Sequence, residues 1–220
     1  VEGLAANLDA LLQTKRTVLY YGPRSAEDVL LALRNSFLAE KPSRKVSPIE
    51  PNRALVPNES QVFFLQKEMA QAQVRIEFAT GLYDEKKAPA GQLFNEYFGG
   101  GMAGLVFQEL REARALAYSA WAHYFNPARP NEENILAGAI GCQADKTLDA
   151  VEACMELLEK MPINETRWQS AHSSILSSYR TNPIGYRSTP SFVYDVNALG
   201  LKGDPRRNRY ETLRLAEIDL

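Results

Sequence analysis

The sequence predicts an α+β fold: a mainly antiparallel sheet covered by helices on one face. Strand-like runs occur in pairs between groups of helices instead of alternating with them, which is the order typical of this class. Residues 72–80 also alternate apolar and polar side chains, as expected for a sheet with one face in water. The two sets are Val74, Ile76 and Phe78 on one face and Gln73, Arg75 and Glu77 on the other.

The first 58 residues predict a strand–helix unit followed by a connector. Leucines recur at helical spacing over residues 2–13, and a short β-type run over residues 16–21 ends at a Gly-Pro pair. Ser25, with Asp28 three residues later, is typical of a helix start. Four prolines in residues 41–58 exclude a helix there and indicate a surface connector.

The remainder, residues 59–220, is predicted to be one domain that continues past the last residue. Its expected elements, in chain order, are strands at 61–66 and 72–80, helices at 89–98 and up to Arg111, a hairpin of 117–125 with 134–143, and helices around 148–158 and 168–179. Residues 1–40 are expected to end a preceding domain or to form the first strand–helix unit. The final residues, 213–220, have the pattern of a helix start, so we expect the chain to be a piece of a longer polypeptide.

Composition excludes several classes of function. Lys and Arg number 25 against 27 Asp and Glu, and this balance leaves no basic footprint for nucleic acid. No apolar run approaches the roughly 18 residues of a membrane helix. Cys142 and Cys154 are expected to be buried free thiols, which leaves the compartment, cytoplasmic or periplasmic, open.

The residues needed for a metal site or a nucleophile are missing. His123 and His172 are the only histidines, neither has a second ligand at helical spacing, and the two cysteines lack metal-ligand spacing. His123 is therefore expected to have a structural role. No G-x-S-x-G elbow occurs either, so the sequence predicts no metal and no cofactor in this chain.

Two further features have competing interpretations. The glycine run at 99–101 follows a helix and lacks the Lys-Ser/Thr of a phosphate loop, which favours a helix end with a tight turn. Arg111 and Tyr118 lie at a predicted helix end and strand start. In one interpretation, Arg111 is a charge that complements the helix dipole and Tyr118 is a half-buried strand residue. In the other, both residues are hydrogen-bond donors that converge on a peptide carbonyl.

The segment that contains both features closely resembles the signature segment of the insulinase/pitrilysin family of inverted-motif zinc peptidases. Residues 95–119 read NEYFGGGMAGLVFQELREARALAYS. The resemblance implies the metalloenzyme fold shared with LuxS and mitochondrial processing peptidase. It also implies a protein of two homologous halves that close over a peptide. The other half would carry the H-x-x-E-H motif and the zinc ion, either in the same chain or in a separate subunit.

By the same resemblance, Arg111 and Tyr118 would contact the substrate and help to stabilise the tetrahedral intermediate. This chain would then be the substrate-holding half of a zinc metalloendopeptidase and would be inactive alone. Its expected partners are the zinc-binding half and a peptide substrate. Neither nucleic acid nor a membrane is expected as a partner. The alternative is a non-catalytic scaffold or partner subunit of the same family. The sequence departs from many relatives at Leu105, where an Arg is common, and at Ala115, where a Gly is common.

Overall fold

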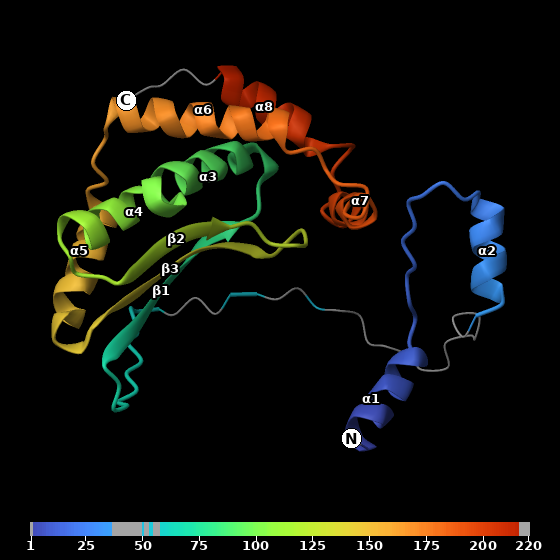
Figure 1. Ribbon diagram of the computed structural model, residues 1–220, viewed down its shortest axis with the longest axis horizontal. Helices are drawn as coiled ribbons and strands as arrows, with labels where there is room; N and C mark the ends of the chain where they lie inside the picture. The colour runs from blue at the N-terminus through green and yellow to red at the C-terminus, as the bar shows by residue number, and fades with distance from the viewer. Residues whose placement is uncertain (1, 37–49, 51–52, 55–57, 216–220) are drawn as a thin grey trace. The chain divides into compact units, whose positions relative to one another are not determined.

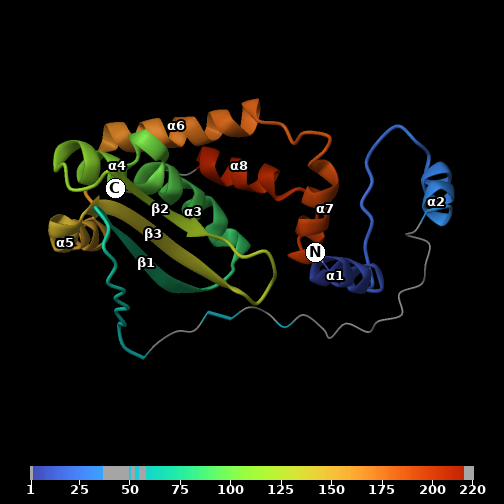
Figure 2. The ribbon, with the colours of Figure 1, turned by 60° about the horizontal axis from the view of Figure 1, so that its bottom comes forward.

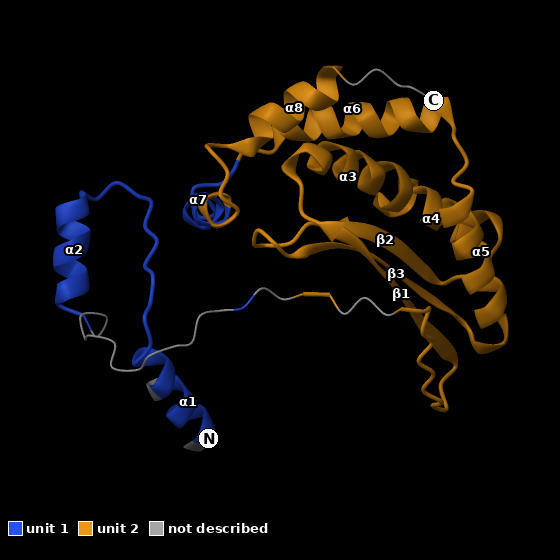
Figure 3. Ribbon diagram, turned by 180° about the vertical axis from the view of Figure 1, so that it is seen from behind, with its two compact units in different colours: residues 1–51, 184–195 blue, residues 52–183, 196–220 orange. Residues whose placement is uncertain are grey.

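The computed structural model describes residues 2–36, 50, 53–54 and 58–215. The chain divides into two compact units, residues 1–51 with 184–195 and residues 52–183 with 196–220 (Figure 3). The predicted boundaries at residues 40 and 58 fall in or next to segments outside the described residues. The predicted division into domains therefore stays a prediction.

The first unit contains α1 (Glu2–Leu12) and α2 (Ala26–Arg34). The start of α2 confirms Ser25 as the predicted N-cap, because its hydroxyl accepts a hydrogen bond from the Asp28 amide at 3.1 Å; the hydroxyl also donates to the Asp28 carboxylate at 2.8 Å. Residues 16–21, predicted as a strand, are extended chain outside any ladder of the described residues. β propensity needs a hydrogen-bonded neighbour to become a strand.

The second unit is built on a three-stranded antiparallel sheet. Its strands are β1 (Gln71–Leu82), β2 (Ser119–Phe125) and β3 (Glu133–Gln143), in the order β1-β3-β2 (Figure 1). This confirms the predicted strand at 72–80 and the predicted hairpin. The strand predicted at 61–66 is absent from the ladders of the described residues, and Phe63 there is 88% exposed. Its apolar sequence resembles a strand, but the structure describes no partner for its backbone.

The two faces of the sheet differ as the alternation in β1 predicts. On the covered face Val74 lies opposite Ile140, which lies opposite Ala120 in β2, and all three pack in the core. On the open face Arg75 lies opposite Ala139, which lies opposite Trp121. Helices cover the first of these faces (Figures 1 and 2). The expected α+β architecture is therefore confirmed.

The covering helices form two layers over the sheet. The inner layer is a broken helical path in which short 3₁₀ and π turns interrupt the α-helix. Its members are η2 (Glu85–Lys87), α3 (Ala88–Phe94), η3 (Asn95–Gly99), η4 (Gly101–Ala103), α4 (Leu105–Phe107) and η5 (Gln108–Ala113). The outer layer is α6 (Glu165–Thr181) and α8 (Pro205–Leu215), while η6 (Ala144–Lys146) leads into α5 (Thr147–Glu159) at one end of the sheet (Figure 1).

The end of the chain corrects one prediction. Leu213 and Leu215, expected near the start of a helix, instead end α8, and residues 216–220 lie outside the described residues. The apolar spacing was correct, but the helix begins upstream at Pro205. The helix α7 (Thr189–Ala198) precedes it and belongs to both units.

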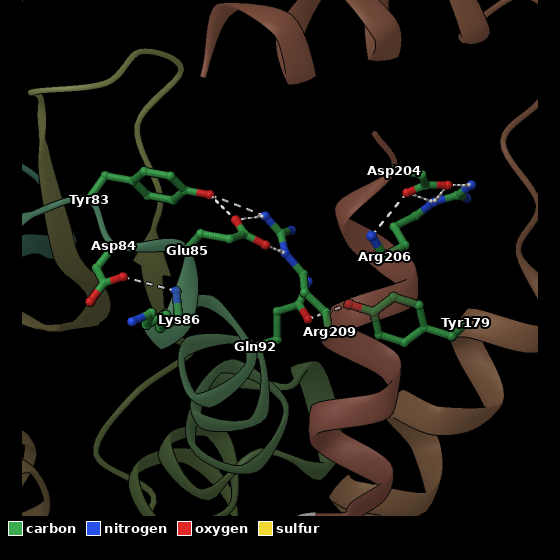
Figure 4. Close-up of polar contacts among 9 residues, drawn as sticks. All are labelled: Tyr83, Asp84, Glu85, Lys86, Gln92, Tyr179, Asp204, Arg206 and Arg209. Atoms are coloured by element: carbon green, nitrogen blue, oxygen red, sulfur yellow. Dashed lines mark hydrogen bonds and ion pairs between the residues drawn. The ribbon is translucent and has the colours of Figure 1, made fainter. Parts of the chain in front are cut away.

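A cluster of polar side chains fastens α8 to the inner layer. Arg209 donates to both carboxylate oxygens of Glu85, at 2.7 and 2.6 Å, and to the Tyr83 hydroxyl at 3.2 Å (Figure 4). The Tyr83 hydroxyl also hydrogen-bonds Glu85. Nearby, Tyr179 of α6 donates to Gln92 of α3 at 2.6 Å. The contacts of Arg209 and Tyr179 join residues more than 80 positions apart.

Candidate functional site

The candidate site begins with Arg111, which projects from the π-type turn η5. Leu110 and Val106, on the buried side of the same helical path, have 0% and 1% of their surface exposed. Because these neighbours are fixed in the core, the backbone that carries Arg111 is held firmly. The Arg111 side chain itself is 44% exposed.

Tyr118 stands directly before β2. Its amide donates to the Gly141 carbonyl of β3 at 2.7 Å, which attaches this position to the central strand. Its side chain is 72% exposed, although tyrosine usually buries most of its ring in a sheet. The prediction that a helix end and a strand start place these residues is confirmed for the backbone, since η5 ends at Ala113 and β2 begins at Ser119.

The structure brings the two side chains together. The guanidinium carbon of Arg111 lies 5.9 Å from the centroid of the Tyr118 ring and 4.8 Å from that of Phe107. Glu112 forms an ion pair with Arg111 at 3.5 Å. Neither the guanidinium nor the Tyr118 hydroxyl donates a hydrogen bond to any residue that the structure describes. Two neighbouring donors are thus available to an acceptor from outside.

The turn between the two residues depends on an unusual backbone angle. Ala115 has φ +49°, in the left-handed region that favours glycine. The turn is closed by hydrogen bonds from the amides of Leu116 and Ala117 to the Leu110 carbonyl, at 2.9 and 3.2 Å. Ala115 therefore occupies the position after a helix end where glycine is usual.

The glycine run ends the helical turn η3 and forms a tight turn, as predicted, and it also allows close packing. A Cβ on Gly99 would lie 1.8 Å from the Ala122 carbonyl oxygen, so only glycine lets η3 approach β2 this closely. Gly101 has φ +61° and begins η4. Leu105, close behind the glycine run, is 3% exposed and belongs to the core.

Both histidines have structural contacts. The side-chain nitrogen Nδ2 of Asn95 lies 3.3 Å from Nε2 of His123. The centroid of the His123 ring is 4.5 Å from that of Phe125. Burial lowers the pKa of His123. His172 hydrogen-bonds the Leu213 carbonyl at 2.7 Å, which joins α6 to α8. Over the described part of the chain, no group of three or more His, Cys, Asp or Glu residues is placed to hold a metal ion.

Burial also governs the cysteines. Cys142 and Cys154 are both buried free thiols, as expected, and burial raises the pKa of Cys154 to about 11. The thiolate of Cys154, which is its reactive form, is therefore scarce at neutral pH. No helix among the described residues is long and apolar enough to cross a membrane.

Phe107 is the part of this site that sequence reasoning missed. It lies four residues before Arg111, a spacing that places two side chains on the same side of a helix. That spacing is a signal, but it is common and does not by itself show a contact between ring and guanidinium.

Comparison with known proteins identifies the family. A family model described as the peptidase M16 inactive domain matches residues 6–169, which is most of the chain. The chain belongs to the peptidase M16 family. This confirms the resemblance to the insulinase/pitrilysin peptidases that the signature segment carries. No curated protein matches the sequence of this M16 domain.

Solved structures agree with this fold. An M16 inactive domain from Pseudomonas fluorescens aligns with TM-score 0.62 and 12% identity over 89% of this chain and 46% of that one. A protease from Helicobacter pylori gives TM-score 0.62 and 13% identity over 89% and 48%. An inactive peptidase domain from Bordetella parapertussis gives TM-score 0.51 and 14% identity over 70% and 84%. The chain thus spans about half the length of the first two.

Proposed function

We propose that this M16 inactive domain is the substrate-holding half of a zinc metalloendopeptidase, with Arg111 and Tyr118 as its contacts to the peptide. The observation that supports the proposal is the convergence of these two exposed side chains, whose donors make no hydrogen bond to a residue that the structure describes. Donors fixed near a scissile carbonyl stabilise the negative charge that develops on its oxygen.

The two donors have different chemistry. The guanidinium keeps its charge at any working pH and offers several N–H groups in one plane, which suits a carbonyl or carboxylate oxygen. The phenol adds one neutral O–H donor. Held on opposite sides of one turn, they can orient a peptide and stabilise a tetrahedral intermediate without themselves exchanging protons.

The residues that the structure describes do not offer a zinc site. Neither histidine is free of structural contacts, and the described residues offer no cluster of ligands. The proposal therefore assigns zinc to a homologous half, in the same polypeptide or in a separate subunit, and assigns binding and orientation to this one. We expect the chain alone to bind no zinc stoichiometrically and to cleave nothing.

The test is kinetic and uses the chain assembled with its zinc-binding half. With a quenched fluorogenic peptide that the wild-type assembly cleaves, Arg111→Ala or Tyr118→Phe should each lower kcat/KM by roughly 100-fold, the scale of one lost charge-stabilising donor. Arg114→Ala is the matched control, since Arg114 is an exposed neighbour that pairs with Glu156 at 3.3 Å. It should leave the rate unchanged.

A second function remains as an outcome of the same test. If the parent lacks H-x-x-E-H in its other half, or if both variants cleave at the wild-type rate, the domain is a scaffold or partner-recognition subunit instead. Determining the full parent sequence separates these cases first.

A further inference from the structure

The Arg111 side chain lies against an aromatic ring on its own helical path. Its guanidinium carbon is 4.8 Å from the centroid of the Phe107 ring, closer than the 5.9 Å to the Tyr118 ring. A cation within about 6 Å of a ring centroid is attracted by the negative face of the ring. Phe107 is thus the nearest aromatic contact of the proposed substrate-binding arginine.

The backbone beneath Phe107 is well anchored. Val106 and Leu110, on either side along the path, have 1% and 0% of their surface exposed. The next residue, Gln108, donates from its amide to the Gly104 carbonyl at 3.1 Å and from its side chain to the Met102 carbonyl. The backbone at Phe107 is therefore held in place, and its half-buried ring turns about two side-chain bonds, whereas Arg111 has a longer and more flexible side chain.

The other contacts of Arg111 are weaker restraints. Its ion pair with Glu112 spans 3.5 Å, and both side chains are about half exposed, at 44% and 53%. Exposed pairs of this kind contribute little. Tyr118 is 72% exposed and is itself a proposed contact to the peptide. Of the three neighbours, only Phe107 is half-buried, whereas Glu112 and Tyr118 are exposed.

We propose that Phe107 is a positioning residue that holds the Arg111 guanidinium in the orientation used to contact the peptide. The proposal rests on the proposed function of Arg111. An arginine that already occupies its binding orientation loses less rotamer freedom when the substrate arrives, so Phe107 acts through Arg111 and touches no substrate atom.

The first experiment is a double-mutant cycle in the assembly with the zinc-binding half, measured with the same fluorogenic peptide. Phe107→Leu and Phe107→Met keep an apolar side chain but remove the ring, and each should lower kcat/KM by about two- to five-fold, the scale of an exposed cation–π contact. Phe107→Tyr keeps the ring and should retain the wild-type rate. In an Arg111→Ala background, Phe107→Leu should cause no further loss.

The second experiment needs no activity. In NMR spectra of the chain with labelled arginine, the Arg111 side-chain protons, assigned with Arg111→Lys, should be shifted upfield by the Phe107 ring. The shift should disappear in Phe107→Leu and Phe107→Met and persist in Phe107→Tyr.

The outcomes separate the two proposals. A wild-type rate for Arg111→Ala overturns the proposed function, whatever the spectra show. The positioning role is overturned if Arg111→Ala greatly lowers kcat/KM while Phe107→Leu and Phe107→Met both keep the wild-type rate. It is also overturned if Phe107→Leu lowers kcat/KM by the same factor in the Arg111→Ala background as in the wild type. Absence of the upfield shift in the wild type overturns it as well.

Discussion

Ala115 shows how one residue sets the geometry of the site. It is exposed and has φ +49°, between the helical turn that carries Arg111 and the strand that begins after Tyr118. A left-handed conformation costs an L-residue with a Cβ roughly 1–2 kcal/mol, which glycine avoids. Alanine nevertheless occupies this position, and two hydrogen bonds to the Leu110 carbonyl close the turn around it.

Relieving this strain should stabilise the domain. We expect Ala115→Gly to raise the free energy of unfolding by about 0.5–1 kcal/mol, because the relief of strain exceeds the extra chain entropy of glycine. Thermal unfolding should then show a Tm about 2 °C higher. Ala113→Gly, two residues earlier and equally exposed but helical, is the control and should destabilise by about 1 kcal/mol. A lower Tm for Ala115→Gly would contradict this account of the turn.

At the scale of elements, the helical turn η3 covers part of the outer edge of β2. The Asn95 side chain accepts a hydrogen bond from the Tyr124 amide at 2.6 Å and donates one to the Tyr124 carbonyl at 3.0 Å. One side-chain amide thus replaces a neighbouring strand for one residue, and Gly99 packs on Ala122 beside it. Covering an edge in this way protects it from pairing with other chains.

Removing that side chain should expose the edge. Asn95→Ala leaves the Tyr124 amide and carbonyl without a partner, and we expect a loss of about 1–3 kcal/mol in denaturant unfolding. In hydrogen exchange the Tyr124 amide should lose protection, while the amides of the central strand β3 keep theirs. Asn95→Asp, which retains the acceptor, should lose less. Unchanged exchange at Tyr124 would show that the edge is protected by something else.

At the scale of the whole second unit, the cluster of Tyr83, Glu85 and Arg209 joins the end of β1 to α8 (Figure 4). Burial by itself would raise the pKa of Glu85, but the hydrogen bonds from Arg209 and Tyr83 outweigh it and lower that pKa below its ordinary value. Arg209 and Glu85 are only 15% and 28% exposed, so the pair is shielded from solvent.

Breaking this pair should destabilise the unit in a pH-dependent way. We expect Arg209→Gln to cost about 2 kcal/mol at neutral pH, whereas Arg214→Gln on the same helix, which breaks a half-exposed pair with Glu211, should cost less than about 0.5 kcal/mol. Since the pKa of Glu85 is lowered by folding, the wild type should lose this stabilisation as pH falls below about 4.5. When Tm is measured against pH, the curves of the wild type and of Arg209→Gln should converge in acid.

Tyr83 should act at the opposite end of the pH range. Burial, with the Glu85 carboxylate beside it, raises the pKa of Tyr83 to about 12 from 10.0. A group whose pKa is raised by folding contributes stability below its unfolded pKa and loses it above, so the wild type should lose stability between pH 10 and 12. The Tyr83→Phe variant should lack this loss, and a difference titration of phenolate absorbance should give the pKa.

Sequence reasoning succeeded where a pattern is local. The alternation in β1, the N-cap at Ser25 and the glycine run each depend on residues within a few positions of one another, and each was confirmed. It failed for strands at 16–21 and 61–66, because a strand exists only if a distant segment offers its backbone hydrogen bonds. The covered edge at Asn95 was missed for the same reason.

For the candidate site, the sequence by itself determined the family and the identity of two donors seven residues apart, Arg111 and Tyr118. Only the tertiary structure decided that they meet. The left-handed turn at Ala115 reverses the chain, β3 holds Tyr118 by its amide, and the Phe107 ring lies beneath the guanidinium. Convergence of side chains depends on how a turn is closed and what it packs against, which residue spacing does not contain.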